Sequence, residues 1–240
     1  MTFDEMNNCL AIITARGGSK RIPRKNIKPF LGQPIINYSI QAAIGAGCFD
    51  EVMVSTDDEE IGQVARTAGA KVPFMRSDAN SDDYSTTADV LKEVLRSYRD
   101  AGKQFKYFCC IYPTAPFVTS EKLSRAYQLL TEAGAKSVVP VVRFGFPIQR
   151  SFKIEEGLVK MNWPEHVNSR SQDLQPAFHD CGQFYFVRTE DFLNDGKLFT
   201  DKTLPIEMPE SEVQDIDNVE DWKVAEIKYT FLKQKQEGGI

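Results

Sequence analysis

The 240-residue sequence has little of the residue types on which many metal and disulfide frameworks depend. It contains only two histidines, so a histidine-rich metal site is not expected. It has no C-x-x-C pair, and its cysteines are odd in number, with two of them adjacent in an apolar run. This usage indicates reduced thiols in a cytoplasmic protein rather than a disulfide framework. The five cysteines are Cys9, Cys48, Cys109, Cys110 and Cys181.

Long apolar runs and an excess of positive charge are also missing. No apolar run approaches the roughly eighteen residues that a membrane-spanning helix needs. The first eight residues, MTFDEMNN, are polar and include acids, unlike a signal peptide. The formal net charge is -5, whereas a protein that binds a nucleic-acid backbone usually has a broad basic face. We therefore expect neither a membrane nor a nucleic-acid partner.

What the chain does contain is an alternation of short apolar runs with longer amphipathic segments. Alternation of this kind predicts βαβ units, and so a Rossmann-like α/β fold with a mainly parallel sheet flanked by helices. Such sheets bind ligands at the carboxyl ends of their strands. We predict strands over 9–14, 51–56, 71–76, 107–113, 137–144 and 183–188, and helices over 34–47, 58–70, 85–102, 120–134 and 219–236.

The pattern changes between residues 144 and 166. Two alternating segments flank Glu155-Glu156-Gly157, which predicts a hairpin that projects from the domain. The remaining parts, 9–143 and 167–236, would form a single α/β domain. The hairpin is either an interface arm or a surface feature without a role.

The most unusual segment is ARGGSKRIPRKN, residues 15–26, which carries five cations and no acid in an acidic chain. It follows the first predicted strand and so falls at the ligand-binding edge. Gly17 and Gly18 would let the backbone approach a ligand and cradle phosphate oxygens with its N–H groups. The segment matches neither the G-x-x-x-x-G-K-[ST] nor the G-x-G-x-x-G motif. A phosphate site and a solvated basic turn both fit this charge pattern.

Two acidic pairs are further candidates. Asp57 and Asp58 begin a predicted helix, where acids satisfy free N–H groups, so we expect a capping role. Asp215 and Asp217 in VQDIDNVEDW point the same way if the chain is extended there. That geometry suits Mg²⁺, which binds one or two carboxylates together with substrate phosphates. A capped turn before the last helix fits the same residues.

The stretch AIITARGGSKRIPRKNIKPFLGQPII resembles the signature of the cytidylyltransferases that activate acidic nine-carbon sugars, the CMP-sialic acid synthetase family. The resemblance implies a fold of the nucleotide-diphospho-sugar transferase type. It implies that the loop contacts the phosphates of CTP, and that FMRSDANSDDYSTTADVL meets the cytosine. The nucleotide-binding residues implied are Ala15, Arg16, Gly17, Ser19, Lys25, Asn26, Arg76, Ser81 and Thr86.

Two later segments resemble the family's sugar site. YPTAPF (112–117) is similar to the family's QPTSP loop, but Tyr112 stands where the neuraminate enzymes carry Gln. A phenol is bulkier and bonds differently, which argues against neuraminate itself as the substrate. NSRSQDLQPAFHDCGQFYF (168–186) is similar to the family's R-x-Q-D segment and its G-x-x-Y strand. The sugar-binding residues implied are Tyr112, Arg170, Gln172, Tyr185 and Asp215.

The resemblance also bears on the metal and on assembly. The family has a D-x-D just before its closing helix, which implies that Asp215 and Asp217 bind Mg²⁺. The predicted hairpin resembles the family's dimerisation arm, which implies a homodimer.

Within the family, the chain resembles the pseudaminic acid branch most closely. The implied reaction is CTP plus pseudaminic acid giving the CMP-sugar and pyrophosphate, with attack of the anomeric hydroxyl on the α-phosphorus. Arg16, Lys25 and Asp217 would be the catalytic residues. A neuraminate or legionaminate cytidylyltransferase, a glycosyltransferase that uses a nucleotide sugar, and a non-catalytic nucleotide-binding protein are the alternatives.

Overall fold

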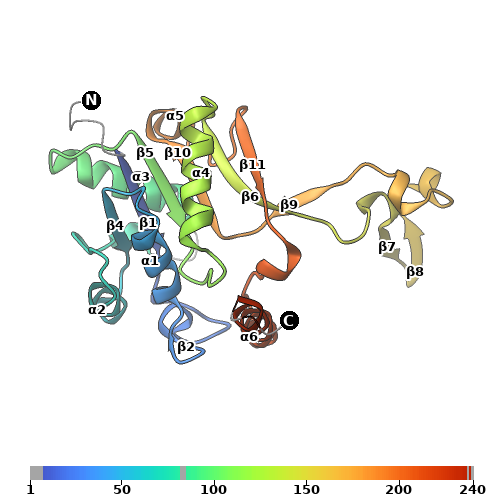
Figure 1. The fold of residues 1–240 in the computed structure, drawn as a ribbon, viewed down its shortest axis with the longest axis horizontal. Helices are drawn as coiled ribbons and strands as arrows, with labels where there is room; N and C mark the ends of the chain where they lie inside the picture. The colour runs from blue at the N-terminus through green and yellow to red at the C-terminus, as the bar shows by residue number, and fades with distance from the viewer. Residues whose placement is uncertain (1–7, 82–84, 237, 239–240) are drawn as a thin grey trace.

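The computed structural model describes residues 8–81, 85–236 and 238, and a seven-stranded sheet forms its centre (Figure 1). The strands follow the order β11-β6-β10-β5-β1-β4, and β9 pairs with the far end of β6. Strand β10 runs antiparallel to both neighbours, and β9 runs antiparallel to β6, while the other pairs are parallel. The predicted fold class is confirmed. The strands are β1 (Cys9–Thr14), β4 (Glu51–Ser55), β5 (Tyr107–Ile111), β6 (Ser137–Arg143), β9 (Phe178–Asp180), β10 (Phe184–Arg188) and β11 (Thr203–Glu207).

Helices cover both faces of the sheet because its strands are apolar on both sides. In β1, Ala11 and Ile13 face one core cluster, which α1, α2 and α4 complete. Leu10 and Ile12 face the other cluster, which contains residues of α3 and α5. All four β1 side chains are fully buried. These helices are α1 (Ile36–Gly45), α2 (Glu59–Thr67), α3 (Thr87–Asp100), α4 (Ser120–Glu132) and α5 (Thr189–Asp195).

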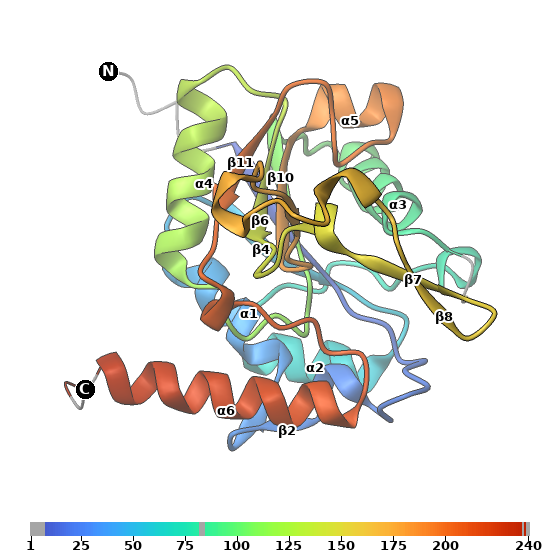
Figure 2. The same cartoon turned by 90° about the vertical axis from the view of Figure 1, so that its right-hand side faces the viewer.

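The closing helix α6 (Val219–Gln236) lies against the small hairpin of β2 (Pro29–Phe30) and β3 (Gln33–Pro34), as Figure 2 shows. Trp222 packs edge-on against Phe30, with ring centroids 5.6 Å apart. The basic loop lies just before β2. The packing of α6 on β2 therefore places the residues that precede α6, including the D-x-D segment, next to the basic loop. The outer side of α6 exposes Ile227 and Phe231, so the helix is apolar on two sides instead of one.

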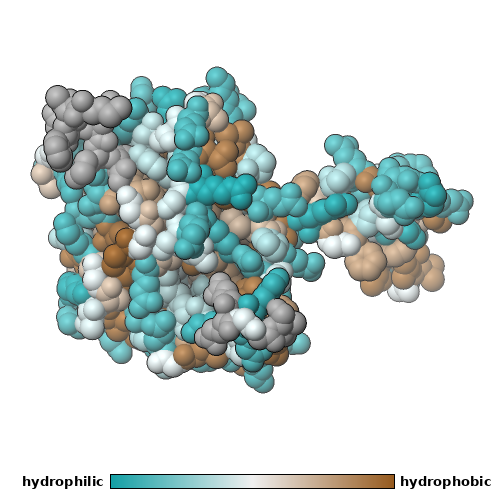
Figure 3. All heavy atoms as spheres, in the orientation of Figure 1, coloured by the Kyte–Doolittle hydropathy of each residue, from teal (hydrophilic) through white to brown (hydrophobic). Residues whose placement is uncertain are grey.

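An arm, defined here as residues 144–177, leaves the body after β6 and returns at β9 (Figure 1). It contains a separate hairpin of β7 (Phe152–Glu155) and β8 (Leu158–Met161), whose turn residues Glu156 and Gly157 both have positive φ. The excursion continues beyond residue 166, the predicted end of the hairpin region. Apolar side chains gather on one side of the arm (Figure 3), and Phe146 and Ile154 are 87% and 76% exposed.

Several elements differ from the sequence predictions. The strand predicted over 71–76 is wrong, because only Lys71 forms a bridge, to Met53, and the chain then turns away. Strands β2, β3, β9 and β11 and helix α5 were not predicted, since each is short and carries no clear period. No helix in the described part of the chain is long and apolar enough to cross a membrane.

Candidate active site

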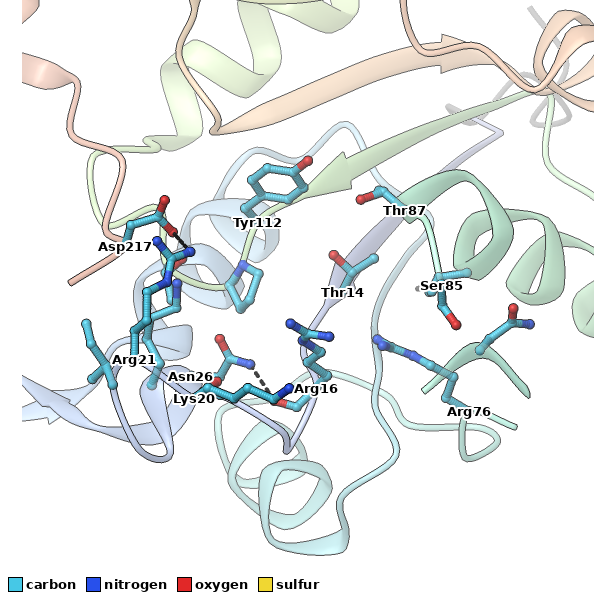
Figure 4. A pocket seen from close by; sticks show the side chains of 17 residues that line it. Thr14, Arg16, Lys20, Arg21, Asn26, Arg76, Ser85, Thr87, Tyr112 and Asp217 are labelled. Carbon is cyan, nitrogen blue, oxygen red and sulfur yellow. Dashed lines mark hydrogen bonds and ion pairs between the residues drawn. The ribbon is translucent and has the colours of Figure 1, made fainter. Parts of the chain in front are cut away.

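A cavity of about 520 Å³ opens beyond the carboxyl ends of β1 and β5, at the edge where the basic loop was expected (Figure 4). Its size is typical of small-molecule sites. Residues far apart in the sequence meet there, from the basic loop, the segment after β4, the start of α3, the end of β5 and the D-x-D segment. The wall includes Thr14, Arg16, Ser19, Lys20, Arg21, Lys25, Asn26, Arg76, Asn80, Ser85, Thr87, Tyr112 and Asp217.

The first turn of the basic loop is held by backbone contacts. The N–H of the buried Ala15 donates to the Ser55 carbonyl at 3.0 Å, and the N–H of Gly17 donates to the Asp57 carboxylate at 2.9 Å. A Cβ on Gly17 would lie 2.7 Å from an oxygen of Asp58, so a larger residue here would displace the Asp58 carboxylate. These contacts fix the backbone of Ala15 and Gly17, and their predicted role in nucleotide binding stays a prediction.

Arg24 anchors the outer end of the loop to α2. It adopts a left-handed conformation with φ of 54°, and its guanidinium donates to both oxygens of Asp58 and to Glu60. The Arg24 hydrogen bonds lower the pKa of Asp58 to about 2. Asp58 also caps α2 by accepting from Ile61 N–H at 3.0 Å, which confirms its predicted capping role. Arg24 thus faces α2 and is not part of the cavity wall.

Lys25 joins the loop to the D-x-D segment. Its Nζ donates to the Ile216 carbonyl at 2.7 Å, and burial lowers its pKa, although the charges of Asp217 and Asp215 act in the opposite direction. Asn26 is 5% exposed and donates from Nδ2 to the Arg16 carbonyl at 2.9 Å. Asn26 therefore braces the loop, while Lys25 keeps its ammonium in the cavity.

The two acids of the D-x-D segment differ in position. Asp217 lines the cavity and pairs with Arg21 at 2.8 Å. Asp215 lies behind it, where burial, and secondly the charge of Asp217, raise its pKa. Asn218 and Asp221 accept the N–H groups at the start of α6, so capping requires neither of the D-x-D carboxylates. Among the described residues, no three metal-ligating side chains converge, and the acids here form only a pair.

Arg76 is not an ordinary surface cation. It is 8% exposed, and its guanidinium donates to the hydroxyl of Ser55 at 3.1 Å and to the Ser55 carbonyl at 2.5 Å. Burial lowers the pKa of Arg76. Its side chain extends into the cavity opposite Arg16 (Figure 4).

Ser81 and Thr86 use their hydroxyls within their own segment. Ser81 donates to the Ser77 carbonyl at 2.7 Å, and Thr86 forms a capping box with Asp89 at the start of α3. Neither side chain lines the cavity, and their predicted contact with cytosine stays a prediction. Their neighbours Asn80, Ser85 and Thr87 line the wall instead. The run of hydroxyl residues identifies this segment in the sequence. Which of the side chains face the cavity depends on the local backbone conformation, which the sequence pattern does not reveal.

The predicted sugar residues divide between the body and the arm. Tyr112 lines the cavity, and Tyr185 lies behind it with ring centroids 5.5 Å apart. Burial raises the pKa of both phenols. Arg170 lies on the arm, is exposed, and pairs with Asp173 at 2.8 Å. Gln172 lines a second cavity at the base of the arm. A single chain therefore does not bring Arg170 or Gln172 to Tyr112.

The fold has counterparts among solved structures. A solved structure of CMP:2-keto-3-deoxy-manno-octonic acid synthetase complexed with CTP matches 94% of this chain and 99% of its own chain, with a TM-score of 0.66 at 15% identity. This likeness is one of fold, a mainly parallel sheet with its cavity at the carboxyl edge of the strands.

Sequence comparison narrows the class to a family. The model of the cytidylyltransferase family matches residues 10–193. A pseudaminic acid cytidylyltransferase of Campylobacter jejuni is 42% identical over 92% of this chain and 95% of its own length. An N-acylneuraminate cytidylyltransferase A of Danio rerio is 38% identical over 90% of this chain and 49% of its own length. The chain belongs to the cytidylyltransferase family.

Proposed function

We propose that this protein transfers CMP from CTP to the anomeric hydroxyl of an acidic nine-carbon sugar, pseudaminic acid, and releases pyrophosphate. The observation that carries the proposal is the meeting of Arg16, Lys25 and Asp217 on one cavity wall. A triphosphate needs several cations, and an attacking hydroxyl needs a carboxylate or another proton acceptor close by. The choice of sugar is supported by the similarity to the Campylobacter jejuni enzyme and by Tyr112 in place of the glutamine of the neuraminate enzymes.

Residues in different parts of the cavity have different roles. Arg16, Ser19 and Lys25 hold the phosphates, and they neutralise the charge that develops as pyrophosphate leaves. Arg76 lies on the side where the cytosine would bind, next to the polar start of α3. Arg can hold two phosphate oxygens at once, whereas Lys offers a point charge.

The carboxylates of the D-x-D segment are suited to bind a magnesium ion and to accept a proton. Asp215 and Asp217 are two carboxylates one residue apart, and Mg²⁺ binds through one or two carboxylates plus substrate phosphates. The pKa of Asp215 is raised first by burial and secondly by the charge of Asp217, which a bound cation would offset. We therefore assign Asp215 and Asp217 to Mg²⁺, which would neutralise phosphate charge when bound. One of the two carboxylates accepts the proton of the sugar hydroxyl.

The assembly and location are part of the proposal. The exposed apolar side of the arm supports a homodimer, since patches of this kind usually mark protein contacts. The five cysteines are free and buried, which supports a reducing compartment such as the cytoplasm. Arg170 and Gln172 remain predicted sugar ligands on this arm.

A pyrophosphate-release assay with CTP and Mg²⁺ tests the activity. The panel contains pseudaminic, neuraminic and legionaminic acids, together with a no-sugar control. We expect the largest kcat/KM with pseudaminic acid. A larger kcat/KM with neuraminic or legionaminic acid would identify that sugar as the substrate in place of pseudaminic acid. Binding of CTP without release of pyrophosphate with any of the sugars would contradict the proposed activity.

A further inference from the structure

We propose that Asp180 is a specificity-determining residue for the sugar, and that Tyr185 is the positioning residue that aims it. The inference rests on the proposed function and deepens it. Asp180 would accept hydrogen bonds from hydroxyl or amide N–H groups on the part of the sugar remote from its carboxylate.

Tyr185 is poorly placed to contact a substrate itself. It is 2% exposed, lies behind Tyr112, and packs on its other side against Phe199, with centroids 5.8 Å apart. Its hydroxyl donates to Oδ2 of Asp180 at 2.5 Å. The raised pKa of Tyr185 keeps this donor protonated. The buried phenol therefore acts on the exposed surface through a carboxylate.

Asp180 is an exposed side chain that is nevertheless fixed. Oδ2 receives the Tyr185 hydroxyl, and Oδ1 receives the N–H of Gly182 at 3.1 Å. Each carboxylate oxygen has room for a further donor. No ion pair joins Asp180 to a cation among the residues that the structure describes, so its charge is not neutralised locally. A held, exposed and unpaired carboxylate is suited to recognise a ligand that carries donors.

Asp180 lies near the D-x-D segment, where we place the sugar. It is the last residue of β9, and two residues further on Gly182 lies beside Asp215, where a Cβ would be in ordinary contact with the carboxylate carbon at 3.8 Å. Tyr112, on the cavity wall, packs against Tyr185 with ring centroids 5.5 Å apart, and the Tyr185 hydroxyl donates to Asp180. This pair of rings connects the nucleotide cavity to Asp180.

The charges set the orientation of an acidic sugar. The negative charge of Asp180 repels the sugar carboxylate. The amide and hydroxyl donors of the sugar are then directed towards Asp180. An acceptor at this position selects donors by geometry, because a wrongly placed group leaves a polar atom unpaired.

Steady-state pyrophosphate release with pseudaminic acid and CTP, each varied separately, tests the inference on the full chain. Asp180→Ala is expected to raise the KM for the sugar about tenfold or more, as for loss of a charged hydrogen bond. The KM for CTP should stay within about twofold of the wild-type value. Tyr185→Phe should raise the sugar KM about threefold without changing kcat, and it should add nothing in the Asp180→Ala background.

Asp201→Asn is the matched control, because this exposed carboxylate pairs with Lys136 away from the cavity. An unchanged sugar KM for Asp180→Ala, or an equal rise in both KM values, would overturn the inference. Additive effects of the two substitutions would overturn the positioning role of Tyr185. If the wild type releases no pyrophosphate with any nine-carbon acid, the proposed function fails and the inference with it.

Discussion

The basic loop and the arm are both excursions from the edge of the same sheet, but their side chains are fixed in different ways. In the loop, Arg24 is held by Asp58 and Lys25 by the Ile216 carbonyl, contacts that span 34 and 191 residues. On the arm, Arg170 has an ion pair only three residues away. The apolar side chains of the arm hairpin, such as Ile154, remain exposed.

This difference indicates which region is complete within one chain. The loop has its acids, carbonyls and packing partners within the body, so its geometry is set when the chain folds. The arm leaves apolar side chains such as Ile154 exposed, and we propose that a second copy of the chain covers them. The two regions should therefore respond differently to substitution. Substitutions in the loop should change the rate of pyrophosphate release, whereas substitutions on the arm should change the oligomeric state.

The largest effect is expected for Lys25→Ala. Removing the half-buried ammonium should lower pyrophosphate release by orders of magnitude, because a preorganised charge on the phosphates is lost. The overall fold and the mass in solution should stay unchanged. Lys202→Ala, at an exposed site beside β11, is the control. Near-normal turnover of Lys25→Ala would remove the phosphate role from this residue.

Asp217→Asn should reduce activity nearly as far, since the substitution leaves one carboxylate for the metal. The expected signature is a shift of the Mg²⁺ dependence to higher concentration, measured by titrating Mg²⁺ at fixed CTP. Asp221→Asn serves as the control, because Asp221 caps α6. An unchanged Mg²⁺ titration for Asp217→Asn would argue against the metal assignment.

For the arm, Ile154→Asp should convert a dimer into a monomer. A charge in the apolar contact would stay unpaired on association, while the exposed position leaves the chain's own fold intact. Light scattering at micromolar concentration reads the mass, with Lys160→Ala on the same hairpin as control. A wild-type protein that is already monomeric would contradict the assigned role of the arm.

The smallest effect concerns the Arg24–Asp58 pair and its pH dependence. The folded pKa of Asp58 is about 2, below the ordinary value of about 4, so the pair stabilises above pH 4 and is lost as the pH falls towards 2. Because Arg24 is partly exposed, we expect Arg24→Ala to cost only about 1 kcal/mol at pH 7. Urea unfolding at pH 7 and pH 3 should show that the loss of unfolding free energy caused by Arg24→Ala is smaller at pH 3. An equal cost at both pH values would assign it to packing.

The sequence predicts the parts of the molecule that have a strong period or a specific motif. The strands and helices around β1, β4 and β5 are buried on both faces and carry clear apolar runs, and the basic loop is a continuous motif. The positions of Arg24, Thr87 and Asp180 could not be predicted, because each depends on a partner remote in sequence or on the phase of a helix. The Arg170 segment was assigned to the sugar site by resemblance, but its place on the arm depends on tertiary structure.

The stems of the arm have a consequence for how such proteins diverge. Arg143 and Phe178, where the arm begins and ends, are paired directly across β6 and β9. The arm is thus an insertion between two neighbouring positions of one ladder, and the strand register does not depend on its length. A shorter or longer insertion would leave the pairing of β6 with β9 unchanged. The length of the arm can therefore vary between related chains without altering the sheet that carries the cavity.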